Sequence, residues 1–440
     1  MRGACTWMTA VMVLGLSVTM VAAAGLEVED TGGKPFRRKI IVTSPGVYRA
    51  EVWQASGGGI MGLYDLSADP EAKVNLASRD RGLFEIGWHG RGFKGPDPAD
   101  QPFCCVKHML QIQKGKEKGK QGCYDGCADW PSLAGHKRLK AWGTLDLIEK
   151  SPARVRIRAR STFVWWGMHD HKNLKVAAEY TFYPTGKIAI QVHVQNDGKM
   201  AFHWSTEYGP HLMVPGSDKN PKVDLGFVWN TPKQDISGKR GRGPSEELFL
   251  ATSKKVKASL MLTIPPQEQK LFSRVMRHNG RSIGWDRCGY ASNGITMNPG
   301  YDSTWACLIQ MGTPGSARSP EMKTTAEALP YAMQYREPAK LTGVTLVKDD
   351  KGDLNTDGTN ESEGCHVLKG PGPLSFTYEK GKGAGFAPAF KVIGWNGDAP
   401  KTVKLDGKVV PVVAAVVDGK LVFQILETLA GDKVRIDVGG

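Results

Sequence analysis

Residues 203–211 hold the densest group of side chains that could do chemistry. Two imidazoles, a carboxylate, a phenol and an indole lie in this short stretch. Histidine, tyrosine and carboxylate groups serve as general acids and bases, and in an extended chain alternate residues share one face. The predicted catalytic residues are His203, Tyr208 and His211, with Trp204 and Glu207 in substrate binding. Ordinary half-buried strand residues are the alternative.

A second group, between residues 277 and 290, is basic and aromatic. A guanidinium can bind a carboxylate through two parallel hydrogen bonds, so arginines here could hold an acidic sugar. Arg281 is the candidate that neutralises charge during a reaction. Arg277, His278 and Tyr290 are the candidates for substrate binding. A solvated basic loop is the alternative.

A third group follows the pair Trp165-Trp166. His169 and His171 are separated by one residue, which places both imidazoles on the same face of a strand, as a metal site would require. The sequence indicates no third ligand. We therefore predict substrate contacts for both histidines, and a surface loop with aromatic contacts is the alternative.

Arginine alternates strictly with smaller, mostly apolar residues at positions 154, 156, 158 and 160. A period of two places the four guanidinium groups on one face of a strand. His193 lies in the same way beside Gln191 and Gln195. Such a face could line an anion-binding cleft, or it could be a solvated outer face of a sheet.

Seven cysteines follow residue 24: Cys104, Cys105, Cys123, Cys127, Cys288, Cys307 and Cys365. An oxidising compartment favours disulfides, and the first four bracket a lysine-rich loop with too little apolar content to hold itself. A zinc site that uses some of these thiolates with His108 is the alternative. Cys288 and Cys307 are expected to form a third bridge, which leaves Cys365 buried and free.

The segment Asp353-x-Asn355-x-Asp357-Gly358 begins like a calcium-binding loop. The twelfth position, where such a loop carries an acidic ligand, is Gly364. Glu361 or Glu363 could substitute for it, and a plain turn rich in Asp and Asn is the alternative. We predict no cofactor, with calcium and zinc as the alternatives.

The N-terminus predicts export. Arg2 precedes an apolar run over residues 11–21, and three alanines at 22–24 form a cleavage site, as in a secretory signal peptide. The net charge of +14 favours an anionic partner. Export argues against nucleic acid, and neither a basic amphipathic helix nor a membrane anchor is evident. We therefore expect a secreted or periplasmic protein whose partner is an acidic polysaccharide; the oligomeric state is not indicated.

Short alternating segments separated by Gly, Asn, Asp and Pro predict an all-β chain. Clear examples are Lys39–Thr43, Tyr48–Gln54 and Lys187–Asn196. The expected domains are a signal peptide at 1–24, a large β-supersandwich at 25–338 with a Cys- and Lys-rich insertion at 89–135, and a small immunoglobulin-like β-sandwich at 339–440.

Two stretches resemble β-supersandwich domains of the galactose-mutarotase-like fold. They are Tyr48–Trp53, which is followed by Gly57-Gly58-Gly59-Ile60, and Tyr180–Ile188, which contains the turn Pro184-Thr185-Gly186. The resemblance covers residues 39–312 in outline and includes no catalytic signature. It implies a carbohydrate-active protein with a concave, polar sheet face, and a fold alone does not give the reaction.

The leading hypothesis is a polysaccharide lyase that cleaves a uronate polymer by β-elimination. That reaction needs a base, a group that stabilises the developing negative charge, and an acid for the leaving oxygen. His203 or His211 could be the base, Tyr208 the base or the acid, and Arg277 or Arg281 the neutralising group. A glycoside hydrolase, a sugar epimerase and a non-catalytic glycan-binding protein of the cell envelope are the alternatives.

Overall fold

The computed structural model describes most of the chain beyond residue 24. The described residues are 25–33, 37–54, 57–78, 82–87, 106–108, 112–114, 121–123, 144–165, 170–199, 201–204, 208–215, 225–230, 241–244, 246–253, 255–280 and 285–439. The backbone alone is described at 87, 106–108, 112–114, 121–123, 161–165, 170–173, 202–204, 241–244, 278–280 and 285.

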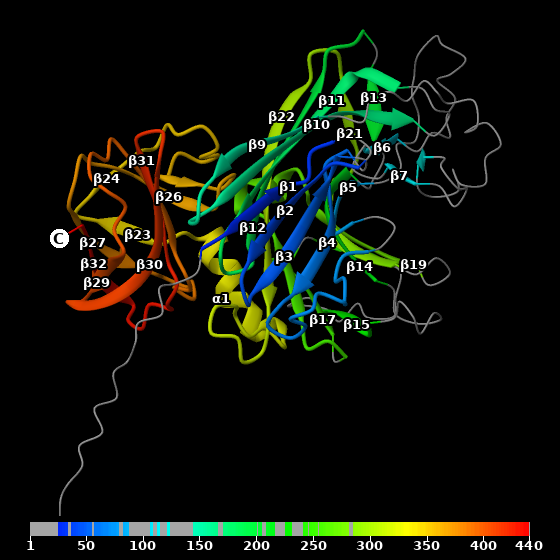
Figure 1. Ribbon diagram of the computed structural model, residues 1–440. Coiled ribbons are helices and arrows are strands. Elements are labelled where there is room, and N and C mark those ends of the chain that lie inside the picture. The colour runs from blue at the N-terminus through cyan, green and yellow to red at the C-terminus, as the bar shows by residue number, and fades with distance from the viewer. Residues whose placement is uncertain are drawn as a thin grey trace, which may run out of the picture.

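A nine-stranded antiparallel sheet, which we call the large sheet, is the main element of the N-terminal lobe (Figure 1). Eight strands form one path and β9 pairs with β10 beside it. The strands are β15 (Phe227–Asn230), β17 (Phe249–Ser253), β18 (Ser259–Thr263), β22 (Asp302–Gly312), β12 (Lys187–Asn196), β11 (Asp170–Phe182), β10 (Val155–Trp165), β6 (Val106–His108) and β9 (Thr144–Lys150).

Two smaller sheets accompany it. One is a four-stranded meander of β1 (Glu27–Asp30), β2 (Lys39–Ser44), β3 (Tyr48–Trp53) and β4 (Gly59–Asp65). The other contains β16 (Gly241–Pro244), β19 (Arg274–Gly280), β20 (Trp285–Ala291), β14 (Tyr208–Pro215) and β5 (Phe84–Gly87). Two further pairs are β13 (Phe202–Trp204) with β21 (Ile295–Met297), and β7 (Ile112–Lys114) with β8 (Gln121–Cys123).

The period of two in the sequence determines which face of the large sheet is buried. On β10, Val155, Ile157 and Ala159 are at most 2% exposed, while the arginines between them point to the other face. Strand β12 repeats this pattern with buried Ile190 and Val192. One continuous apolar core joins residues of all three sheets, and burial of this apolar surface is its main source of stability.

The only α-helix in the described part of the chain is α1 (Thr325–Arg336). It begins with a capping box in which the Thr324 hydroxyl accepts from Glu327 N and the Glu327 carboxylate accepts from Thr324 N. Ala328 and Ala332 pack against Leu250 and neighbouring apolar residues of β17 and β18. No described helix is long and apolar enough to cross a membrane.

The chain then forms a second β-rich unit with its own apolar core, which includes Phe376, Phe390 and Phe423. Figure 1 shows it, in orange and red, as a lobe beside the larger one. Its strands are β23 (Lys340–Thr342), β24 (Thr345–Leu346), β25 (Thr359–Asn360), β26 (Cys365–Lys369), β27 (Leu374–Glu379), β28 (Ala389–Ile393), β29 (Thr402–Leu405), β30 (Lys408–Val417), β31 (Lys420–Ile425) and β32 (Lys433–Val438). We call residues 339–439 the C-terminal unit.

The loop at 350–364 of the C-terminal unit packs against the larger lobe. Three of its backbone carbonyls accept hydrogen bonds from side chains of the preceding chain: Tyr335 Oη to Glu361 O at 3.0 Å, Tyr183 Oη to Glu363 O at 2.6 Å and Lys187 Nζ to Gly364 O at 2.9 Å. Most of these residues are buried, so the bonds form away from competing water.

The sequence-based prediction of an all-β fold is confirmed. Strand β12 coincides with the predicted strand Lys187–Asn196. Helix α1 was not expected, because its sequence contains a proline, Pro330, and is not amphipathic. The proposed domain boundaries stay a prediction.

Candidate functional site

The outer side of the large sheet carries a row of polar side chains, which we call the polar face. In register across β10, β11, β12 and β22, Arg158 lies opposite Glu179 and Glu179 opposite Gln191. At the next position on the same face, two residues further along each strand, Arg160 lies opposite Ala177, Ala177 opposite His193, and His193 opposite Thr304. The polar face consists of Arg156, Arg158, Arg160, Glu179, Gln191, His193 and Asp302.

Ala177 leaves room between two of these groups. It contributes only a methyl group, and it stands between Arg160 and His193 on adjacent strands. Strands lie about 4.8 Å apart, so the Cα atoms of Arg160 and His193 are about 10 Å apart. The guanidinium of Arg160 and the imidazole of His193 are therefore carried by strands on either side of a small residue.

His193 forms a pair with Asp302. The His193 Nε2 and Asp302 Oδ1 atoms are 2.7 Å apart, and the side chains are 40% and 57% exposed. When Nε2 carries the proton, it donates to the carboxylate and Nδ1 keeps a lone pair. The pair therefore presents an oriented base to solvent.

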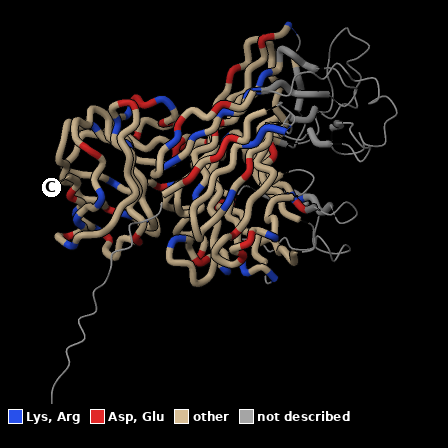
Figure 2. Tube along the Cα trace, viewed as in Figure 1, with Lys and Arg blue, Asp and Glu red and all other residues tan. Residues whose placement is uncertain are grey.

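The arginines of the polar face are held by carboxylates. Glu179 Oε1 accepts from Arg158 Nε at 2.6 Å, and Glu179 Oε2 accepts from Arg156 Nη2 at 3.0 Å. Arg160 Nη1 lies 3.2 Å from Asp146 Oδ2. The terminal nitrogens of Arg158 have no partner among the described residues, so they can receive an incoming carboxylate. Figure 2 shows acidic and basic residues interspersed over both lobes.

Two predicted catalytic residues lie in the interior. Tyr208 is fully buried, its hydroxyl accepts from Trp305 Nε1 at 2.8 Å, and burial raises the pKa of the phenol well above its usual value. His211 is also fully buried. Burial, assisted by the positive charge of Arg287, lowers the pKa of His211 to about 3, so its imidazole is neutral at ordinary pH.

Arg277 and Tyr290 belong to the same five-stranded sheet as these two residues. Arg277 is 3% exposed, with Nη2 3.9 Å from Asp286 Oδ2. Tyr290 is fully buried and packs edge-on against Phe249, with 4.7 Å between ring centroids. Burial raises the pKa of Tyr290. Strands β14, β19 and β20 thus carry four of the predicted residues in one sheet, and all four side chains are buried.

The remaining predicted site residues are not described as side chains. Only the backbone is described for His203 and Trp204 in β13, His278 in β19 and His171 in β11. His169, Glu207 and Arg281 lie outside the described residues. Whether these groups meet Tyr208 and His211 stays a prediction.

The strict alternation of arginines, and His193, indicated the polar face. The pairing of His193 with Asp302 was not indicated, because it depends on the register between β12 and β22.

The expected bridge between Cys288 and Cys307 is wrong. Both thiols are buried and unpaired, because Cys288 lies on β20 of the five-stranded sheet and Cys307 on β22 of the large sheet. Burial raises the pKa of each thiol. Cys365 is buried and free, as expected. The side chains of Cys104, Cys105, Cys123 and Cys127 lie outside the described part of the structure.

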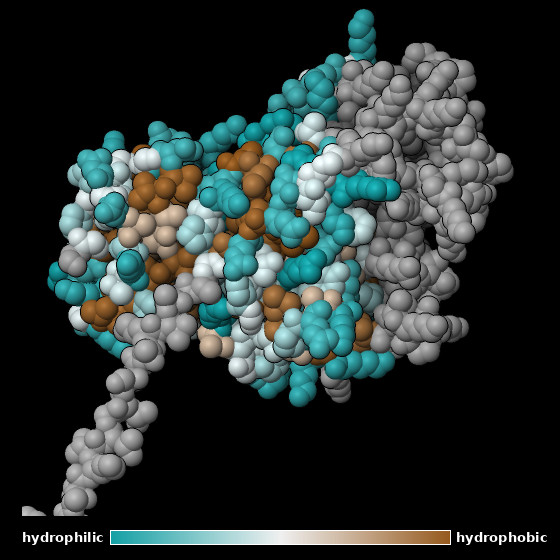
Figure 3. All heavy atoms as spheres, viewed as in Figure 1, coloured by the Kyte–Doolittle hydropathy of each residue, from teal (hydrophilic) through white to brown (hydrophobic). Residues whose placement is uncertain are grey.

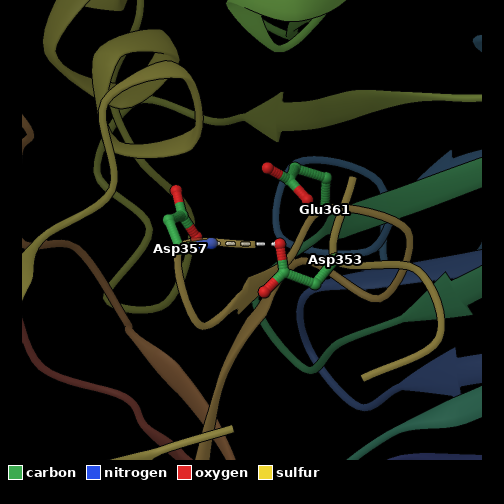
Figure 4. Close-up of side chains that lie close together, drawn as sticks. All are labelled: Asp353, Asp357 and Glu361. Atoms are coloured by element: carbon green, nitrogen blue, oxygen red, sulfur yellow. Dashed lines mark hydrogen bonds between the residues drawn. The ribbon is translucent and has the colours of Figure 1, made fainter. Parts of the chain in front are cut away.

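Three carboxylates of the 350–364 loop converge (Figure 4). Oxygen atoms of Asp353, Asp357 and Glu361 all lie within 4.8 Å of one another. Burial raises the pKa of Glu361 to about 7, and its oxygens accept from Leu354 N at 2.8 Å and Gln267 Nε2 at 3.1 Å. Asp353 Oδ1 accepts from Thr356 N at 2.7 Å, as in an Asx turn. Such oxygens suit a hard cation, so calcium stays an alternative. A plain turn rich in Asp and Asn accounts equally well for the cluster.

No protein-family model matches the chain, and no curated protein sequence matches it. Solved structures that resemble it include a TPR-domain containing protein from Parabacteroides distasonis (9% identity, 62% of this chain, 46% of that chain, TM-score 0.36). Others are a galactose mutarotase-like protein from Clostridium acetobutylicum (10%, 66% and 99%, 0.35) and galactose 1-epimerase from Lactobacillus acidophilus (8%, 66% and 98%, 0.29). This chain thus spans less than half of the first of them, and TM-scores at this level say nothing about reaction or substrate.

Proposed function

We propose that this protein is an exported lyase that binds a uronate-containing polysaccharide on the polar face and cleaves it by β-elimination. The observation that carries the proposal is the exposed pair of His193 and Asp302, 2.7 Å apart, across from a row of arginines. A base and a carboxylate-binding cation are two of the three groups that this reaction needs, and the protonated base can serve as the third, the acid.

The chemistry follows from the positions of the groups. A guanidinium of Arg158 or Arg160 binds the uronate carboxylate and stabilises the negative charge that develops when the neighbouring proton leaves. His193 Nδ1 takes the proton from C5 of the uronate, and Asp302 stabilises the imidazolium that forms. The C4–O4 bond then breaks, a C4–C5 double bond forms, and the imidazolium returns its proton to the leaving oxygen.

The bulk properties support an acidic polymer as the partner. Basic residues exceed acidic ones by 14 over the whole chain, which raises the local concentration of polyanions. Figure 3 shows hydrophilic residues interleaved with separate apolar patches on the face in view. The N-terminal leader pattern supports export, which would bring the protein to such polymers.

A glycoside hydrolase needs two carboxyl groups on opposite sides of the bond that breaks. On the polar face, both oxygens of Glu179 already bind Arg156 and Arg158, and Asp302 binds His193. Neither is placed as an independent acid, which makes hydrolysis the weaker proposal.

The test is to incubate the purified protein with alginate, pectate, glucuronan and glycosaminoglycans. A rise in ultraviolet absorbance from the unsaturated product would support the lyase, and it should disappear in His193→Gln. New reducing ends without absorbance would favour hydrolysis. Binding without turnover, lost in Arg158→Ala, would select a non-catalytic glycan-binding protein, and absence of both would refute the proposal.

A further inference from the structure

Buried ion pairs connect the C-terminal unit to the polar face. Glu363 is 5% exposed and lies between three cations. Its Oε2 atom is 2.6 Å from Arg154 Nη1 and 3.0 Å from Lys391 Nζ, and its Oε1 atom is 3.2 Å from Arg156 Nη1. Burial alone would raise the pKa of this carboxyl, but the cations lower it to about 2. Glu363 is therefore ionised at neutral pH.

The ion pairs continue outward from Glu363 to the exposed arginines. Arg156 uses Nη1 for Glu363 and Nη2 for Glu179 Oε2, at 3.0 Å. That arrangement leaves Glu179 Oε1 for Arg158 Nε, at 2.6 Å. The two arginines of the series are more exposed than its inner end, since the side chains of Arg156 and Arg158 are 21% and 31% exposed and that of Glu363 is 6% exposed. The series therefore runs from the buried junction between the lobes to solvent.

The geometry of a guanidinium lets the partner bound at one edge determine how its other edge is oriented. A guanidinium is planar, and a carboxylate bound at Nε leaves the far edge, with its terminal nitrogens, for a second partner. If Glu363 lost its charge, Glu179 would be the nearest remaining carboxylate for Arg156, since Glu149 Oε2 lies 4.0 Å from Arg156 Nη1. Arg156 would then take both oxygens of Glu179 and displace Arg158 Nε.

We propose that Glu363 is a positioning residue for the polar face: through Arg156 and Glu179 it fixes the guanidinium of Arg158 in the orientation that receives a substrate carboxylate. This inference rests on the proposed function. It gives the C-terminal unit a part in substrate recognition, although this unit contributes no residue to the polar face itself.

The experiment compares Glu363→Gln with Asp350→Asn. Asp350 is the other carboxylate that holds Lys391, at 2.7 Å, so both substitutions remove one negative charge from the same buried cluster. Only Glu363 also contacts Arg156. The readouts are KM and kcat on alginate, pectate and glucuronan oligomers, or the dissociation constant if turnover is absent, with circular dichroism as the check on folding.

We expect Glu363→Gln to lower kcat/KM roughly threefold to tenfold, because Arg158 both binds the substrate carboxylate and stabilises the developing charge, and Asp350→Asn to stay within about twofold of the wild type. Glu179→Gln should weaken binding in the same way. The Glu179 side chain is 17% exposed, so its substitution should disturb folding less and tests the same series even if Glu363→Gln does not fold. In the double variant the two effects should not add, because both break one connection.

The outcomes separate the two claims. If the wild type neither binds nor cleaves any of the polymers, the proposed function is refuted. If the wild type binds and Arg158→Ala binds equally well, Arg158 is not the carboxylate-binding group, and the positioning role alone is refuted. If Arg158→Ala weakens binding while Glu363→Gln matches Asp350→Asn, or Glu179→Gln has no effect, the positioning role alone is refuted.

Discussion

The polar face of the large sheet and the interior of the five-stranded sheet contain the same kinds of residue in opposite surroundings. His193 is 40% exposed and paired with Asp302, whereas His211 is fully buried with its pKa lowered to about 3. The arginines differ in the same way, since Arg160 is 53% exposed and Arg287 is fully buried beside Glu85. The difference teaches that the place of a strand in the assembly, rather than residue type, decides which groups reach solvent.

The largest expected effect tests the exposed histidine. His193→Gln should lower turnover of a uronate polymer about 10²- to 10⁴-fold, because it removes the proposed general base. Stability should change by less than about 0.5 kcal/mol, since the site is exposed. Initial rates of absorbance increase and urea denaturation measure the two. A variant that retains turnover would mean that His193 is not the base.

The second prediction concerns the buried ion pair. Arg287 Nη1 lies 3.5 Å from Glu85 Oε2, and both side chains are 0% exposed. Glu85→Gln should lower the free energy of unfolding by about 3 kcal/mol, because it leaves a buried guanidinium charge less compensated. The matched control is Asp146→Asn, whose partner Arg160 is exposed. Equal decreases in the free energy of unfolding of the two variants would show that burial does not distinguish the two ion pairs.

The third prediction uses pH. The pKa of His211 is lowered on folding to about 3, so below its unfolded value of 6.5 the unfolded chain binds the additional proton. Its contribution is present above pH 6.5 and is lost as pH falls toward 3. The advantage of wild type over His211→Gln should therefore shrink by about 1.4 kcal/mol per pH unit between pH 6 and 4. A difference that is independent of pH would show that His211 is accessible to protons in the folded state.

The smallest expected effect is on stability at the edge of the polar face. Arg160→Ala should change the free energy of unfolding by less than about 0.5 kcal/mol, because exposed ion pairs contribute little. The same variant should bind a polyuronate more weakly, and added salt should reduce the gap between variant and wild type. Calorimetric titration at two ionic strengths measures this, and unchanged binding at low salt would exclude Arg160 from the contact surface.

Much of the fold follows from alternation in the sequence. The residues Val155, Ile157 and Ala159 are buried between arginines, as a period of two requires, and the fold class was predictable from such segments. Local pattern could not give the pairing of β12 with β22, which brings Asp302 to His193 from more than a hundred residues away. It also could not show that Arg154 leaves the row of exposed arginines to bind Glu149 and Glu363.

The site was harder to predict because burial is a property of the whole assembly. The stretch around Tyr208 is rich in acid and base types, yet β14 is buried along its entire length between β5 and β20. No local feature distinguishes a strand that faces solvent on one side from one covered on both. The alternation at Gln191 and His193 was a better guide to exposure, since a half-exposed strand keeps polar residues at every second position.

The three carbonyls of the 350–364 loop that accept bonds from Tyr183, Lys187 and Tyr335 have a consequence for proteolysis. These contacts, together with the pairing of Arg154 and Glu363, do not depend on the peptide chain between α1 and β23. A protease that cut this connection would produce two fragments that still elute as one particle under native conditions and separate only in denaturant.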